Sequence, residues 1–207
     1  MTSTDNKIPS RSPAYDEDGA DITLISSEAE EFKVHAYMLK ANSTIFRDML
    51  GDPAFRPSGS IDIEASSEDL TYFLNFMYKC HAEAPQTWDQ AKRILDLCDK
   101  FDCEIVSKRI RCRLKRVVRG DPWEAFALAS HHHDIKMAEW ALRGLGFDEK
   151  RKNITSDTIS LADASKVSLP YLLGFLHLSH SSVSWNETTR TYEKNWNSLG
   201  KKFTLRE

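Results

Sequence analysis

The stretch from Ala20 to Met49, ADITLISSEAEEFKVHAYMLKANSTIFRDM, decides how this chain folds. Apolar and polar residues alternate from Ile22 and again from Phe32, which is the period of a half-buried strand. The polar run between the two segments can turn the chain. After His35 the spacing of the apolar residues becomes helical. Two strands followed by apolar helices, with no reactive group on either, predict a binding scaffold.

The same stretch carries the pattern FxVHxxxLxxxSxxFxxML, and this pattern resembles a BTB/POZ domain. The resemblance covers about residues 20 to 118. Ile61–Ile63 is similar to the family's third strand, Leu70–Tyr78 to its helix ending in FxYxG, and Ala91–Phe101 to its LLxxAxxL helix. The residues that carry the first pattern are Phe32, Val34, His35, Leu39, Ser43, Phe46, Met49 and Leu50. The resemblance implies an α+β fold, a three-stranded sheet flanked by about five helices, followed by a small all-α extension.

Composition and start signals divide the chain into four expected segments. Residues 1–19 are rich in Ser, Pro, Asp and Glu, which predicts a disordered N-terminal tail. Residues 20–119 are the BTB/POZ-like domain. Asp121-Pro122-Trp123-Glu124 begins a helix, and residues 120–179 resemble the helical extension called BACK that follows many BTB domains. Residues 180–207 are expected to form a polar C-terminal tail with isolated aromatic residues.

Capping sequences and apolar periodicity together predict the helices and the core. Ser66 and Thr87 precede helical patterns with a polar partner three residues on, and a last amphipathic helix is expected near Leu169 to Leu178. We expect the residues on the apolar side of each period to be buried. These are Ile22, Leu24, Val34, Phe46, Leu70, Phe73, Leu74, Ile94, Leu95 and Ile110.

Histidines and cysteines do not suggest a metal site. The run His131–His133 places neighbouring side chains about 100° apart on a helix, so we interpret them as ordinary residues of a helix end. Cys98 and Cys103 lack the second paired arm that zinc sites use, and buried small apolar cysteines are the favoured interpretation. We expect neither a metal nor a cofactor.

Seven basic residues crowd the predicted helix 104–119, which would suit a contact with phosphate. Apolar residues recur on one face of this helix, however, and no aromatic residue is interleaved for stacking on bases. We therefore favour a solvated face or a patch for an acidic protein partner, and a nucleic-acid-associated transcriptional regulator is the alternative. The basic residues are Lys108, Arg109, Arg111, Arg113, Lys115, Arg116 and Arg119.

Nothing in the sequence favours catalysis or membrane insertion. There is no nucleophile elbow, glycine-rich phosphate loop or H-E-x-x-H motif, and Asp21 and His35 have no nucleophile beside them. We instead expect His35 to close the corner between strand and helix by hydrogen bonding. No apolar run reaches membrane-spanning length. The net charge of −3 favours neither nucleic acid nor acidic surfaces as partners. We expect a non-enzymatic protein of the cytoplasm and/or nucleus.

The resemblance implies protein partners, either a cullin scaffold or another BTB protein. The predicted partner-binding residues are Met49, Phe55 and Arg56, with Phe55 as apolar anchor. Pro57 stands where the family's cullin-contacting loop carries Glu, which weakens the expectation of cullin binding. The residues before Asp21 lack the amphipathic helix that BTB dimers exchange, so a monomer or weak homodimer is expected.

Overall fold

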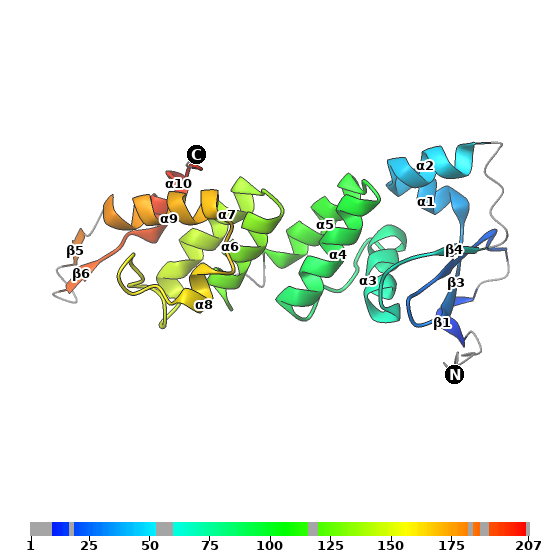
Figure 1. The fold of residues 1–207 in the computed structure, drawn as a ribbon, viewed down its shortest axis with the longest axis horizontal. Helices are drawn as coiled ribbons and strands as arrows, with labels where there is room; N and C mark the ends of the chain where they lie inside the picture. The colour runs from blue at the N-terminus through cyan, green and yellow to red at the C-terminus, as the bar shows by residue number, and fades with distance from the viewer. Residues whose placement is uncertain are drawn as a thin grey trace, which may run out of the picture. The chain divides into compact units, whose positions relative to one another are not determined.

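The computed structural model describes residues 10–16, 19–52, 60–115, 120–181, 184–186 and 191–205 (Figure 1). The chain divides into two compact units, Met1–Ile110 and Arg111–Glu207. The boundary falls inside helix α5, Glu104–Leu114. Among the described residues, no helix combines the length and the apolar character that crossing a membrane requires.

Among the described residues, the first unit contains a four-stranded mixed sheet and five helices, which confirms the predicted α+β class. The strand order is β1-β3-β2-β4; β2 and β3 form an antiparallel hairpin, β1 runs parallel to β3, and β4 runs parallel to β2. Figure 1 shows α3 next to the strands and α1 and α2 on another side of them. The elements are β1 Ser10–Asp16, β2 Ile22–Ile25, β3 Glu30–Val34, α1 Ala36–Asn42, α2 Thr44–Gly51, β4 Ser60–Asp62, α3 Ser67–Tyr78, α4 Trp88–Lys100 and α5.

Strand β1 corrects two expectations, because residues 10–16 are not a disordered tail and the sheet has four strands rather than three. Tyr15 of β1 is buried against Phe32 of β3 and Tyr78 of α3. One buried aromatic residue in a polar, acidic segment leaves no period in the sequence. The strand is therefore stabilised by long-range contacts that periodicity cannot reveal.

The core of the first unit follows the predicted pattern closely. Every predicted core residue is buried except Ile22, which is half-buried at the start of β2. Phe46 of α2 stacks on Phe101 at 4.7 Å between ring centres, and α1 and α2 are separate helices because Ser43 is extended. The Ser43 hydroxyl accepts the N–H of Phe46 (2.9 Å) and donates to the carbonyl of Phe101 (2.5 Å). One serine thus begins α2 and attaches it to the end of α4.

The second unit is mainly helical and has an aromatic core. Within it, Phe126 of α6 lies against Tyr171 and Phe175 of α9 at 6.1 Å between ring centres, and the edge of Trp123 meets Phe175 at 5.0 Å. The predicted helix near Leu169 to Leu178 is confirmed as α9. The elements are α6 Pro122–His131, α7 Ile135–Gly144, the 3₁₀ turn η1 Leu145–Phe147, α8 Leu161–Ala164, α9 Leu169–Ser181, β5 Ser184–Asn186, β6 Thr191–Glu193 and α10 Trp196–Lys201.

The expected polar tail of residues 180–207 is wrong, because this part of the chain contains the β5–β6 hairpin and helix α10. Trp196 lies parallel to Phe175 at 5.9 Å and donates its indole N–H to the carbonyl of Lys152 (2.6 Å). Phe203 meets the ring of Phe126 at 5.5 Å. The C-terminal aromatic residues therefore complete the core of the helical unit.

Close approach of backbones confirms how tightly this segment packs. A Cβ at Gly200 of α10 would lie 2.7 Å from the carbonyl oxygen of Glu139 on α7. A Cβ at Gly174 of α9 would lie 2.5 Å from the carbonyl oxygen of Thr204. Both distances are too short for any side chain, so glycine is required at each position.

Candidate interaction site

The start of α2 is fastened to the turn between α4 and α5. The backbone N–H of Thr44 donates to the carbonyl of Asp102 (3.4 Å), and the Thr44 hydroxyl donates to the Asp102 carboxylate. Together with the bond from Ser43 to Phe101, these contacts hold the first turn of α2 beside the first turn of α5. Both helices therefore present fixed side chains at this junction.

Apolar side chains are exposed on both sides of the junction. Ile45 of α2 is 44% exposed and Ile105 of α5 is 50% exposed, whereas their neighbours Phe46 and Val106 are fully buried. Met49 lies one turn after Ile45 and is half-buried. We call Ile45, Met49 and Ile105 the junction patch. Exposed apolar side chains on a rigid surface commonly mark a site of protein interaction.

The predicted partner-binding residues fare differently. Met49 belongs to the junction patch, whereas Phe55 and Arg56 lie outside the described residues, so their role stays a prediction. The sequence prediction missed Ile45 and Ile105 as exposed residues. A signal was present, because each directly precedes a buried residue, and consecutive helical side chains point about 100° apart.

The corner between β3 and α1 has a structural explanation. The backbone N–H of His35 donates to the Tyr78 hydroxyl (2.8 Å), and its Nδ1 lies 3.3 Å from the same oxygen. The Asp21 carboxylate accepts the N–H of Ala36 (2.6 Å). The prediction that His35 closes this corner is confirmed, and Asp21 and His35 are both engaged in holding the backbone.

The basic helix has partners for its cations within the chain. Four cations of this helix have a partner within their own unit. Arg116 and Arg119 fall outside the described residues. The pairs are Lys108 with Glu104 (2.6 Å), Arg109 with the carbonyl of Phe76 (2.9 Å), Arg111 with Asp134 (3.3 Å) and the Lys115 ammonium with the ring centre of Trp140 (3.5 Å). Cations held in this way are less available to phosphates, which argues against the nucleic-acid alternative.

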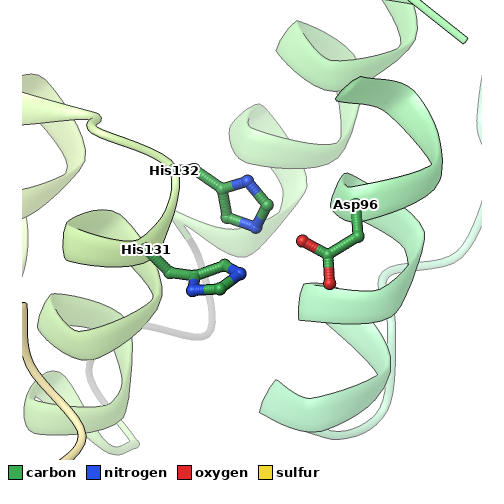
Figure 2. Close-up of side chains that lie close together, drawn as sticks. All are labelled: Asp96, His131 and His132. Atoms are coloured by element: carbon green, nitrogen blue, oxygen red, sulfur yellow. The ribbon is translucent and has the colours of Figure 1, made fainter. Parts of the chain in front are cut away.

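The histidine run lies at a helix end, as predicted. His131 is the last residue of α6, His132 caps it, and His133 has a positive φ of 51°. The rings of His131 and His132 lie 5.0 Å apart because the helix ends between them, so neighbouring side chains converge more than the helical spacing of 100° suggests. Figure 2 shows the two rings where α6 ends. Asp96, drawn in the same figure, belongs to α4 of the other unit.

The cysteines divide into two kinds. Cys98 and Cys103 are buried as predicted, and burial raises the pKa of the Cys103 thiol to about 12. A thiol with so high a pKa is a poor nucleophile at neutral pH. Cys80, just after α3, and Cys112 of α5 are exposed.

Comparison with known proteins identifies the first unit. Residues 14–116 match the model of the BTB/POZ domain. These residues belong to the BTB/POZ family. The match begins at Ala14 and therefore includes Tyr15 of β1. A BTB/POZ domain is a protein–protein interaction module, and such modules are generally non-catalytic.

One curated relative is the "BTB and MATH domain-containing protein 40" of Caenorhabditis elegans. It is 28% identical over 102 residues, which are 46% of this chain and 25% of the relative. The match thus spans about a quarter of the relative's length, approximately the extent of the BTB/POZ domain. The resemblance of residues 120–179 to a BACK extension stays a prediction.

Proposed function

We propose that this chain is an adaptor that docks on a cullin scaffold through the junction patch. Many BTB domains act in this way, and the observation that supports the role here is the pair of exposed isoleucines, Ile45 and Ile105, on either side of the α2–α5 junction. Their buried neighbours and the bonds of Ser43 fix both helices, so the patch is already ordered before a partner binds.

An apolar anchor explains how docking could survive the loss of the family's Glu. Pro57 cannot supply a charge, so the free energy of binding would come from burial of apolar side chains. Complete burial of an isoleucine contributes about 1.5–3 kcal/mol, and each isoleucine of the patch is already about half buried. Each would then contribute about 0.8–1.5 kcal/mol, which corresponds to a change in affinity of up to about tenfold.

The test measures binding of the full chain to purified cullin N-terminal regions by calorimetry. Ile45→Ala and Ile105→Ala are each expected to weaken binding about tenfold, and the double variant about a hundredfold, with unchanged melting temperatures. The matched control is Tyr37→Ala, which removes an exposed apolar side chain (64% exposed) from the β3–α1 corner. Failure of the unaltered chain to bind any cullin, or an equal loss of affinity with the control, would refute the proposal.

We also propose that the chain is a monomer or a weak homodimer. Strand β1, which could pair between copies, pairs with β3 of its own chain. An obligate dimer of the intertwined kind would bury about 2,000 Å² or more. Light scattering on serial dilution should therefore give the monomer mass, and a dimer that persists at nanomolar concentration would contradict this.

A further inference from the structure

Strand β1 is attached to the sheet at its two ends only. Ser10 and Arg11 pair with Glu30 and Glu31, and Asp16 pairs with Lys33. Between these pairs the register is broken, and residues 12–15 stand opposite Phe32 alone. All residues of β1 are exposed except the third and the sixth. β1 is therefore an edge strand with few ladder contacts, the kind of element that opens first in a native protein.

A single aromatic side chain anchors β1. Tyr15 is 6% exposed, and its hydroxyl donates to the side-chain oxygen of Asn75 on α3 (2.9 Å). Its ring lies 6.0 Å from that of Phe32 and meets the ring of Tyr78 edge-on at 5.6 Å. β3 and α3 thus form a socket for one phenol, which we call the Tyr15 socket (Phe32, Asn75 and Tyr78).

The surroundings of the socket are basic. Asp16, the residue after the anchor, forms an ion pair with Lys33 (2.7 Å), and the hydrogen bond from Lys33 holds the pKa of Asp16 below its usual range. A cavity of about 190 Å³ opens beside Tyr15 and is lined by no acidic residue. Its lining is Ala14, Tyr15, Lys33, His35, Tyr78 and Lys79. A ligand with an anionic group next to an aromatic ring would therefore fit the socket and its basic surroundings.

We propose that the outer edge of β3 and the Tyr15 socket form a second docking site, for an extended peptide segment of a partner protein. The segment would add a strand parallel to β3, place an aromatic side chain in the socket and set an acidic residue against Lys33. The chain's own β1 fills the site as an intramolecular ligand with this order of residues, Tyr15-Asp16. The site shares no residue with the junction patch and does not depend on cullin binding.

Competition between β1 and a partner follows from the short connection of β1 to the domain. β1 is joined to β2 by residues 17–21, and a short tether gives a bound segment an effective concentration on the order of millimolar. A partner segment of equal strength therefore cannot displace β1 at ordinary concentrations. Weakening the attachment of β1 opens the site. The N-terminal strand therefore sets how tightly a partner segment must bind in order to occupy the site.

The experiment measures fluorescence anisotropy of a labelled peptide with the sequence SRSPAYD, residues 10–16. The full chain carrying Tyr15→Ala is expected to bind the peptide at least about tenfold more tightly than the unaltered chain, because its own strand has lost its anchor. The same peptide carrying Tyr15→Ala should not bind. Adding Lys33→Asp to the chain should weaken binding about tenfold, and a peptide carrying Asp16→Lys should restore it.

Two outcomes would overturn the proposal. One is a Tyr15→Ala chain that melts like the unaltered protein and yet binds the peptide no better. The other comes from hydrogen exchange on the unaltered chain, which needs no variant to fold. The β1 amides are expected to exchange at least about a hundredfold faster than those of β2 and β3, and equal protection would mean that β1 does not leave the sheet.

Discussion

Replacing Trp196 by alanine is expected to lower the free energy of unfolding of the helical unit by about 3–5 kcal/mol. The indole is only 2% exposed, lies flat on Phe175 and donates a hydrogen bond to the carbonyl of Lys152. Its loss leaves a cavity in the core and removes the hydrogen bond to the Lys152 carbonyl. Removal of the side chain thus has two separate costs.

The measurement is urea denaturation followed by far-UV circular dichroism, which does not depend on tryptophan emission. The control is Leu205→Ala in the same C-terminal segment, where the side chain is 37% exposed and the expected loss is below about 1 kcal/mol. If Trp196→Ala unfolds like this control, α10 is not part of the core, and the polar tail predicted for residues 180–207 describes this segment better.

Comparing α10 with the helices that were predicted correctly shows which structural features can be predicted from a local sequence pattern. The sequence indicates Ser66, Thr87 and Asp121 as caps, and each accepts the N–H of the residue three positions on, at 3.1, 3.1 and 3.2 Å. Capping is local, so the sequence states it directly. In α10 the same kind of signal was present: Asn195 caps the helix. The buried positions of α10, Trp196, Leu199 and Gly200, and Phe203 just after its end follow the helical spacing i, i+3, i+4, i+7.

Strand β1 could not have been predicted in this way. Its anchor, Tyr15, bonds to Asn75, sixty positions away in the sequence, and no neighbouring residue repeats its apolar character. A contact of this kind depends on the finished fold, because the socket exists only once β3 and α3 have packed together. The junction patch could be predicted from the sequence only in part. Burial of Phe46 and Val106 implies that Ile45 and Ile105 face outward, but their closeness to one junction comes from the bonds of Thr44 to Asp102.

Replacing Phe46 by alanine is expected to destabilise the BTB/POZ domain by about 3–5 kcal/mol. Its ring is fully buried and stacks on Phe101 at 4.7 Å, at the place where Ser43 attaches α2 to α4. The loss would therefore remove packing between two helices that are far apart in the sequence. A shift of the urea midpoint, followed by circular dichroism, measures the change.

The neighbouring residue supplies a matched control that separates stability from binding. Ile45 lies on the same turn of α2 but is 44% exposed, so Ile45→Ala is expected to change the free energy of unfolding by less than about 1 kcal/mol while weakening the partner contact. Phe46→Ala should have the opposite profile: a large loss of stability, with binding retained under conditions where the variant is still folded. If Ile45→Ala lowers stability as much as Phe46→Ala, both side chains belong to the core, and the junction patch is not a docking surface.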